Sequence, residues 1–190
     1  MRIGVLAMQG AFREHAAAFE KCGCEAAEVR KPSELEGIDA LVIPGGESTS
    51  IGKLMKDYGL MEPIREMARS GMPIFGTCAG AILLAKELSE GEQPLLELMD
   101  IRVRRNAYGR QVDSFEADLE IPVLGEEPFR GVFIRAPLIE EVWGGAEVLA
   151  RYKGGIVLAR QGRLLAATFH PELTDDLRLH RYFLRMVDTY

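Results

Sequence analysis

The sequence predicts an α/β fold with a mostly parallel sheet, helices on both of its faces and antiparallel strands added to it. In the first half of the chain, short apolar runs alternate with amphipathic stretches, the order typical of parallel strands joined by helices. In the second half, strand-like runs follow one another across short turns. The 190 residues contain no repeat, low-complexity tract or linker, so we expect a single domain over residues 1–190.

The chain begins with a predicted strand, a helix and a second strand. Arg2–Ala7 is a short apolar run typical of a buried strand. Phe12–Lys21 has the pattern of an amphipathic helix, and Gly23 ends it. Cys24–Val29 follows as a short strand. This order is that of two parallel strands joined by a crossover helix.

The next elements surround the two most informative loops of the sequence. Ala40–Ile43 is an apolar strand that stops at a Pro-Gly-Gly breaker. Two helices, Thr49–Tyr58 and Glu62–Ser70, lead to a fourth strand at Pro73–Thr77, and a helix is expected over Ala79–Leu88.

After about Gly91 the texture changes to strands in close succession. Glycine-containing turns join the last three of these strands, which indicates antiparallel hairpins. A helix over Asp176–Val187 closes the chain. The strands expected in this half are Ile101–Arg104, Ser114–Ile121, Val132–Ala136, Glu147–Tyr152, Ile156–Gln161 and Leu164–Thr168.

Composition excludes several classes of function. The formal net charge of −6 argues against general nucleic-acid binding, which needs a basic surface. No apolar run approaches the roughly 18 residues of a membrane span. The apolar stretch at the N-terminus is too short for a secretory signal, so we expect a cytoplasmic protein without membrane contact.

The three cysteines, an odd number without a secretory signal, do not suggest a disulfide framework. Cys22 and Cys24 form a C-G-C pair, but no further Cys or His lies at zinc-ligand spacing. We therefore expect no metal and no cofactor.

The strongest chemical signal is the G-x-C-x-G motif centred on Cys78, between a buried strand and a helix. This is the nucleophile-elbow pattern with cysteine in place of serine. Gly76 and Gly80 allow the strand and helix to approach closely at a sharp turn. The thiol then lies at a helix N-terminus, which favours the thiolate. The backbone N–H of Ala79 lies where an oxyanion would form.

A cysteine nucleophile needs a base and a group that orients the base. His170 follows the last predicted strand in the sequence His-Pro-Glu. Proline keeps its predecessor extended, so His170 and Glu172 can point the same way, and the carboxylate can hold the imidazole tautomer. The other two histidines, His15 and His180, are expected to be surface residues.

A glycine-rich loop, Pro44–Thr49, follows the third strand. Its glycines allow a backbone N–H near Gly46 to serve as the second oxyanion donor. The spacing to Gly52-Lys53 imitates a phosphate-binding loop, but it is one residue too long, and Leu54 replaces the required hydroxyl residue. We therefore do not expect nucleotide binding.

A cluster of arginines is the last feature with possible chemistry. Most of its charges are explained by a solvated strand and turn, but one guanidinium could bind a substrate carboxylate. Spacing does not say which. The members are Arg102, Arg104, Arg105 and Arg110.

The motifs around Cys78 and His170 resemble the triad-type, or class I, glutamine amidotransferases. The resemblance narrows to the glutaminase subunits of pyridoxal 5′-phosphate synthases and covers residue 1 to about residue 187. The further motifs that carry it are Leu6–Gly10, Pro44–Thr49, Arg105-Asn106, Gly109–Glu116 and Gly131–Pro137.

The resemblance implies a flavodoxin-like three-layer α/β/α sandwich. It implies hydrolysis of L-glutamine to L-glutamate and ammonia through a Cys78 glutamyl thioester. Ammonia would pass through a tunnel to a (β/α)₈-barrel synthase subunit in a hetero-oligomer that makes the vitamin B6 cofactor. Gln9 and Gly10 match the partner interface and activation region. The positions that match glutamine binding are Gly46, Glu47, Ser48, Arg105, Ile134 and Arg135.

Activation by docking is a further expectation, because glycine allows the Gly45–Gly46 peptide more than one orientation. In the free chain we expect its carbonyl to point into the site, or the peptide to be disordered. Two other functions stay open: another cysteine hydrolase or deglycase-type protein with the same elbow, and a non-catalytic docking subunit.

Overall fold

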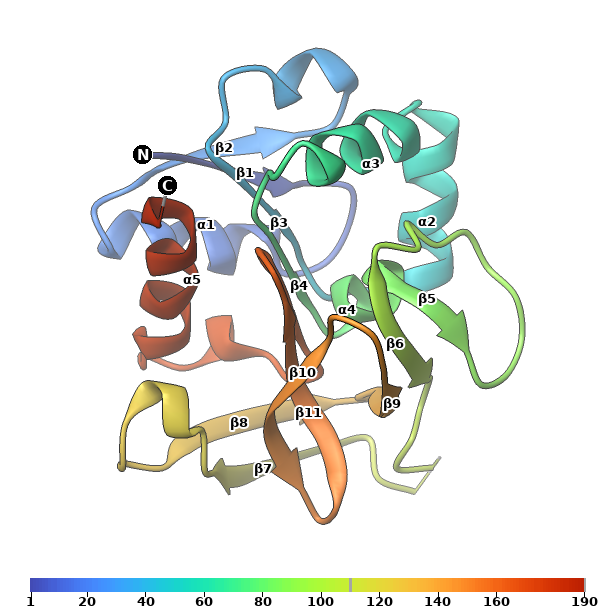
Figure 1. Ribbon diagram of the computed structural model, residues 1–190, viewed down its shortest axis with the longest axis vertical. Coiled ribbons are helices and arrows are strands. Elements are labelled where there is room, and N and C mark those ends of the chain that lie inside the picture. Colours follow the sequence, from blue (N-terminus) through green and yellow to red (C-terminus); the bar gives the residue numbers. More distant parts are fainter. Residues whose placement is uncertain (110, 190) are drawn as a thin grey trace.

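The computed structural model describes residues 1–109 and 111–189, and a curled ten-stranded sheet forms its centre (Figure 1). Five neighbouring strands run parallel in the order β2-β1-β3-β4-β12. This is the strand order of the flavodoxin-like doubly wound fold. The five strands are β1 (Arg2–Leu6), β2 (Glu25–Val29), β3 (Ala40–Ile43), β4 (Ile74–Thr77) and β12 (Leu164–Ala167).

Antiparallel strands extend the sheet beyond β12. They continue it in the order β11-β9-β6-β5, and β10 pairs with β11 outside this path. The last pair, β5 and β6, is again parallel. These strands are β5 (Ala85–Leu88), β6 (Met99–Arg104), β9 (Leu138–Val142), β10 (Glu147–Tyr152) and β11 (Gly155–Gln161). β7 (Ser114–Leu119) and β8 (Phe129–Ile134) form a separate antiparallel ribbon.

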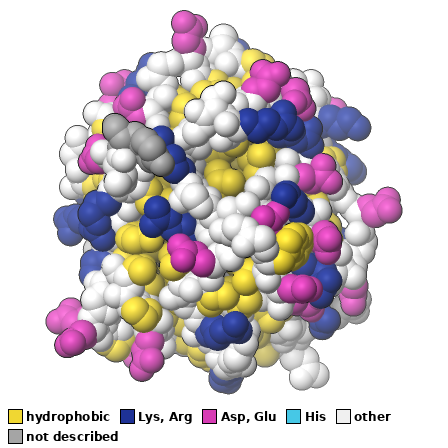
Figure 2. Space-filling view, viewed as in Figure 1, with side chains coloured by type: hydrophobic (Ala, Val, Ile, Leu, Met, Phe, Trp, Pro, Cys, Tyr) yellow, Lys and Arg dark blue, Asp and Glu magenta, His cyan; other side chains and the backbone are white. Residues whose placement is uncertain are grey.

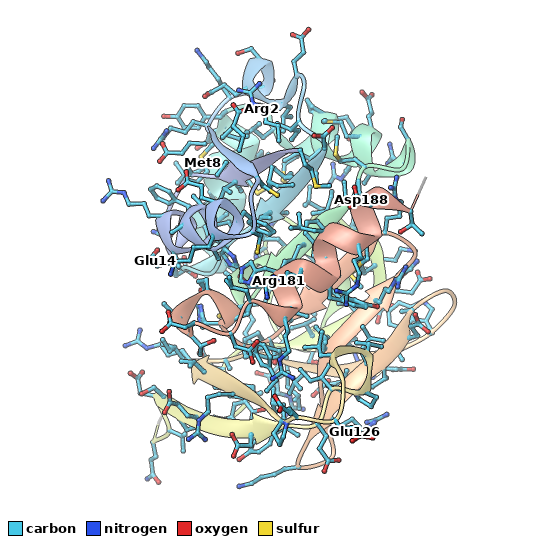
Figure 3. The ribbon with its side chains drawn as sticks, turned by 90° about the vertical axis from the view of Figure 1, so that its left-hand side faces the viewer. Arg2, Met8, Glu14, Glu126, Arg181 and Asp188 are labelled. Atoms are coloured by element: carbon cyan, nitrogen blue, oxygen red, sulfur yellow. The ribbon has the colours of Figure 1, made fainter. Side chains whose placement is uncertain are left out.

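Helices cover both faces of the sheet and complete the three layers. α1 (Phe12–Lys21) and α5 (Arg178–Asp188) cover one face, and Figure 3 shows them near each other, marked by the labelled Glu14 and Arg181. α2 (Ser48–Asp57), α3 (Met61–Arg69) and α4 (Ala79–Leu84) cover the other face. The short 3₁₀ turns are η1 (Pro32–Leu35), η2 (Pro122–Leu124) and η3 (Pro171–Leu173).

The fold prediction is confirmed, and the differences are local. The helix expected over Ala79–Leu88 ends at Leu84, because its last four residues form β5 and pair with β6. The strand β9 (Leu138–Val142) was not predicted. Ser114–Ile121 and Val132–Ala136 were expected in the main sheet but contribute to the separate ribbon. The remaining boundaries agree or differ by at most three residues.

The surface and the topology bear on where a site can lie. Figure 2 shows acidic and basic side chains interspersed over one face. No helix within residues 1–109 and 111–189 is long and apolar enough to span a membrane.

The loops after β1, β3, β4 and β12 leave the carboxyl ends of neighbouring parallel strands, so they meet at one edge of the sheet. This edge is where ligands bind in open α/β sheets.

Candidate active site

Cys78 lies at the turn between β4 and α4 with φ 52° and ψ −106°, a left-handed backbone conformation that a non-glycine residue rarely adopts. A Cβ on Gly80 would lie 1.9 Å from the Ile43 carbonyl oxygen, and one on Gly76 would lie 2.5 Å from the Gly80 carbonyl. The two glycines are therefore required for strand and helix to pack this closely. The predicted elbow geometry is present. Ala79 is the first residue of the helix, so its N–H has no hydrogen-bond acceptor within the helix and is available to a ligand.

His170 lies beside Cys78 and is oriented from its other side by Glu172. The His170 Nδ1 atom lies 2.6 Å from Glu172 Oε1. The side chains of these three residues come from two different chain segments, and all three residues are buried. Burial lowers the pKa of His170, but its hydrogen bonds with Cys78 and Glu172 outweigh burial and raise that pKa to about 10. The imidazole is therefore suited to hold a proton between Cys78 and the Glu172 carboxylate.

The Glu172 carboxylate is ionised despite its burial. Burial raises the pKa of Glu172, but its interactions with His15 and His170 outweigh burial and hold the pKa below its usual value. Its second oxygen, Oε2, accepts no hydrogen bond from the part of the chain that the structure describes. The nearest recorded polar contact of Oε2 is His15 Nε2, 3.3 Å away.

His15 and His180 were expected on the surface, and that prediction is wrong. Both are completely buried. His15 lies on the face of α1 that Phe12 and Phe19 also occupy, and His180 lies on the face of α5 with Phe183. His15 is three residues from Phe12 and four from Phe19, and His180 is three residues from Phe183. This is the i, i+3, i+4 pattern of a buried helix face. That pattern was a sequence signal for their burial.

A cleft of about 950 Å³ opens beside Cys78. Besides Cys78, it brings together six of the predicted site residues, namely Gly46, Glu47, Ser48, Ala79, Arg105 and Arg135. Other residues in its wall were not predicted. Ile82 comes from α4, and the others come from loops whose position depends on the folded structure. These additional residues are Ile82, Glu90, Asn106, Tyr108, Gly109, Val112, Asp113 and Ala136.

Ile134 lies close to this cleft, and the predicted arginines differ in their surroundings. The Cys78 thiol lies 3.8 Å from the backbone carbonyl of Ile134. The Arg135 guanidinium lies 2.6 Å from Asp113 and is largely exposed. Arg102 and Arg104 instead form ion pairs with carboxylates on β9, as expected for solvated charges. Arg110 lies outside the described residues.

Two hydrogen bonds connect the glycine loop after β3 to the loop after β1. The Gln9 side-chain oxygen accepts a 2.7 Å hydrogen bond from the Glu47 N–H. The Gly45 carbonyl accepts one from the Ala11 N–H at 3.3 Å. The expectation that this carbonyl points into the site or is disordered is therefore wrong for this state. The Ala11 N–H holds the carbonyl, and an amide N–H points opposite to its carbonyl.

The Glu47 side chain has a structural task. Its carboxylate caps α2 by accepting from the Thr49 N–H at 3.1 Å and the Ser50 N–H at 2.7 Å. These hydrogen bonds satisfy donors of the first helical turn. The Ser50 hydroxyl donates a further 2.7 Å hydrogen bond, which is the largest cause of the lowered pKa of Glu47, and the two backbone hydrogen bonds add to it. Within the described residues, no group of three or more His, Cys, Asp or Glu side chains is arranged to hold a metal ion.

Comparison with known proteins gives a consistent result. Residues 5–189 match the model of the SNO glutamine amidotransferase family. The "Pyridoxal 5′-phosphate synthase subunit PdxT" of Pelotomaculum thermopropionicum is 66% identical over 97% of this chain and 94% of that protein. The protein of the same name from Moorella thermoacetica is 63% identical over 98% of this chain and all of its own length.

The solved structures agree with the sequence relatives. A structure described as "Crystal structure of glutamine amidotransferase" has a TM-score of 0.94 and 55% identity, and the match covers 98% of this chain and 99% of that one.

Proposed function

The chain belongs to the SNO glutamine amidotransferase family, and we propose that it is the glutaminase subunit of a pyridoxal 5′-phosphate synthase. In this role it hydrolyses L-glutamine to L-glutamate and ammonia. The observation that carries the proposal is the alignment of Cys78, His170 and Glu172 beside a cleft of about 950 Å³. Such a constellation activates a thiol for attack on a carbonyl group.

We propose Cys78 as the nucleophile that attacks the side-chain amide carbon of glutamine. The His170 imidazolium gives its proton to the departing amide nitrogen, so ammonia leaves and a glutamyl thioester remains. His170 then takes a proton from water, which attacks the thioester and releases glutamate and the thiol. Glu172 holds the imidazole through Nδ1 and stabilises its positive charge. No cofactor enters these steps.

The oxyanion hole in this mechanism consists of two backbone N–H groups, from Ala79 and Gly46. The start of α4 fixes the Ala79 group, and both residues line the cleft. The orientation of the Gly45 carbonyl toward Ala11 supports the Gly46 assignment, because it turns the following N–H the other way. Two such donors stabilise the charge that develops on the amide oxygen.

We propose that glutamine binds in the cleft against the predicted set of residues. Because the Glu47 carboxylate caps α2, glutamine meets this residue through its backbone. Arg105 and Arg135 supply positive charge for the α-carboxylate. The complete proposed set is Gly46, Glu47, Ser48, Arg105, Ile134 and Arg135.

The names of the relatives describe them as synthase subunits, which supports a partner synthase subunit for this chain. We further propose that this partner is a (β/α)₈ barrel in a cytoplasmic hetero-oligomer, and that ammonia reaches it through a protein tunnel. The exposed residues Gln9 and Gly10 form part of the contact, since Gln9 holds the glycine loop at the site.

The proposed function is tested by a glutaminase assay of the full chain with its synthase partner, using wild type and Cys78→Ala. We expect the variant to lose glutamine hydrolysis and to keep its fold, because alanine retains the backbone of the elbow and removes only the thiol. Free ammonium salts should restore product formation by the complex. Residual glutaminase activity above a trace in the variant would rule out Cys78 as the nucleophile.

The same assay separates the two alternative functions. If the chain is a docking-only subunit, the wild-type protein will support synthesis from ammonium salts but will not hydrolyse glutamine. Another cysteine hydrolase of this fold would not respond to the synthase partner.

A further inference from the structure

We propose that His15 is a positioning residue for Glu172: its neutral ring presents Nε2–H to the free carboxylate oxygen, and His180 fixes this tautomer. The inference rests on the proposed function of the site. It starts from a buried row of side chains behind the triad, contributed by α1, β4, η3 and α5. Glu14 and Arg181, the sequence neighbours of the two histidines, are labelled on α1 and α5 in Figure 3.

The contacts of His15 define the row. Its Nδ1 atom lies 3.0 Å from His180 Nε2. Its Nε2 atom lies 2.8 Å from Thr77 Oγ1 and 3.3 Å from Glu172 Oε2. Thr77 directly precedes Cys78, so the row contacts both chain segments that carry the triad. His15, Thr77 and His180 are completely buried.

These contacts select one pair of tautomers. The hydrogen-bond partner of His15 Nε2 is Thr77 Oγ1 at 2.8 Å, which can accept or donate, so the Glu172 carboxylate decides between the two. An ionised carboxylate oxygen 3.3 Å away favours a proton on His15 Nε2 over a lone pair. His15 Nδ1 is then an acceptor, and the proton between the two rings belongs to His180 Nε2. The reverse assignment places a lone pair of His15 against the Glu172 carboxylate. It also leaves a proton on His180 Nδ1, a buried atom without a partner among the described residues.

Both rings are neutral at neutral pH. Burial, together with the facing His15, lowers the pKa of His180 to about 3, against a smaller opposite effect of Glu172. Burial also lowers the pKa of His15, opposed by Glu172 and by Glu14 on its own helix, while His170 adds to the decrease. These are the titratable groups that act on the pair.

Neutrality is what the site requires of His15. A cation there would compete with His170 for the charge of Glu172 and would repel the imidazolium that forms during catalysis. A neutral N–H, whose hydrogen bond goes to Thr77 Oγ1, avoids this repulsion and still attracts the carboxylate oxygen 3.3 Å away, so that the other oxygen stays 2.6 Å from His170 Nδ1. Without that N–H, the Glu172 carboxylate is less stabilised and free to rotate, and the pKa of His170 falls.

The first experiment reads the tautomers directly. The chain contains only three histidines, so a full-length sample labelled with ¹⁵N-histidine gives three side-chain spin systems. We expect His15 and His180 to be neutral and protonated at Nε2 across neutral pH. A cationic His15, or one protonated at Nδ1, would overturn the proposal whether or not the chain is a glutaminase.

The second experiment measures glutamine hydrolysis by the complex with the synthase partner as a function of pH. His15→Leu removes the N–H while keeping an apolar side chain. We expect kcat to fall by up to about a hundredfold, the cost of a misplaced catalytic group, with KM little changed. The alkaline limb of the pH profile should move to lower pH. His15→Gln, whose amide N–H can reach the position of Nε2, should recover most of the activity and the profile.

A packing control separates positioning from general loosening. Phe183→Leu disturbs the same aromatic core, next to Phe75 and Phe19, without removing a polar group. It should keep the wild-type pH profile. An unchanged profile in His15→Leu, with active wild type, would refute the role of His15, whereas an inactive wild type would refute the proposed function. If the His15 variants do not fold, the ¹⁵N spectrum of wild type decides.

Discussion

Arg105 illustrates how much the role of a single residue depends on its surroundings. It follows β6 directly, and hydrogen bonds to Thr49, Gln93 and the Glu90 carbonyl hold its guanidinium at 3.0–3.3 Å. It therefore reaches the cleft, while Arg102, three residues earlier, pairs with Glu141 of β9 at 2.6 Å. Spacing in the sequence did not distinguish the two, whereas the family resemblance singled out Arg105.

We expect Arg105→Ala to raise KM for glutamine roughly ten- to a hundredfold, since a lost charge-assisted contact costs about 1.5–3 kcal/mol. The matched variant Arg102→Ala should leave KM unchanged. Steady-state kinetics of the two complexes provide the comparison. Equal KM values would show that Arg105 does not bind the substrate carboxylate.

The buried titratable residues also predict how stability depends on pH. The His170 pKa is raised from 6.5 to about 10, so its contribution is complete below pH 6.5 and is lost as pH rises through 10. The His180 pKa is lowered from 6.5 to about 3, so its neutral state stabilises the fold above pH 6.5 and is lost as pH falls toward 3. The free energy of unfolding should therefore decrease on both sides of pH 6.5.

Single variants test which histidine causes the decrease in stability on each side of this pH profile. In urea unfolding over a range of pH, His170→Asn should flatten the alkaline decrease, and His180→Phe should flatten the acid decrease. A profile for His180→Phe that still matches wild type below pH 6.5 would contradict the assignment.

At this scale the sequence predicted those residues whose role depends on local pattern. Cys78 was recognisable from two flanking glycines, and His170 with Glu172 from an extended His-Pro-Glu segment. The spacing of His15 and His180 to aromatic residues on their own helices was a local signal for burial, but their contact with each other depends on α1 and α5 packing on the same face of the sheet. That arrangement joins residues 165 positions apart, and no local pattern carries it.

At the scale of elements, the tightest constraint is the crossing of β3, β4 and α4. The Gly80 backbone passes so close to β3 that a Cβ would lie 1.9 Å from the Ile43 carbonyl oxygen. A backbone atom cannot move aside as a flexible side chain can. The glycine is thus fixed by packing between elements as well as by the elbow turn.

We expect Gly80→Ala to lower the free energy of unfolding by about 3 kcal/mol or more, the upper range for overpacking. Gly145→Ala is the matched control, because its Cβ would meet only the Gln161 side chain at 3.5 Å, an ordinary contact. Its effect should stay within about 0.5 kcal/mol. Urea denaturation measures both. A Gly80→Ala protein as stable as the control would mean that β3 and α4 are not packed as described.

The elements that the sequence did not predict are those set by distant partners. After Leu84 the apolar pattern continues, which favoured a longer helix. The chain instead leaves the helix because the carbonyls of Leu83 and Leu84 accept hydrogen bonds from Leu96 and Leu98. β9 was missed for a similar reason, since it is defined by pairing with β6 and β11. The helix Phe12–Lys21 and the strand Ala40–Ile43, whose patterns are local, were predicted to the residue.

At the scale of the whole molecule, one sheet connects the two halves of the chain. β12, from the C-terminal half, pairs in parallel with β4 and so brings His170 next to Cys78. Apolar cores lie on both faces of this sheet and draw on elements from both halves. We therefore propose that residues 1–190 form one glutamine amidotransferase domain, because the site exists only when both halves are folded.

The last prediction concerns the dependence of this site on its partner. The donor proposed at Gly46 rests on a loop with two adjacent glycines. That loop is tied to its neighbour by the Gln9 hydrogen bond to Glu47 and a longer one between Gly45 and Ala11. Gln9 and Gly10 are exposed. A partner that covers them would therefore restrict the glycine loop to the orientation described here, rather than create that orientation.

We expect the isolated chain to hydrolyse glutamine at least tenfold more slowly than the complex, since losing one oxyanion donor costs about a hundred- to a thousandfold in kcat. Gln9→Ala should lower kcat of the complex toward that of the isolated chain, because it removes the side chain that connects the contact surface to the loop. The measurement is kcat of each protein alone and with excess synthase partner. A ratio near one for wild type would show that the glycine loop is already held in its active orientation, since the energy needed to restrain two glycines would then come from this chain alone.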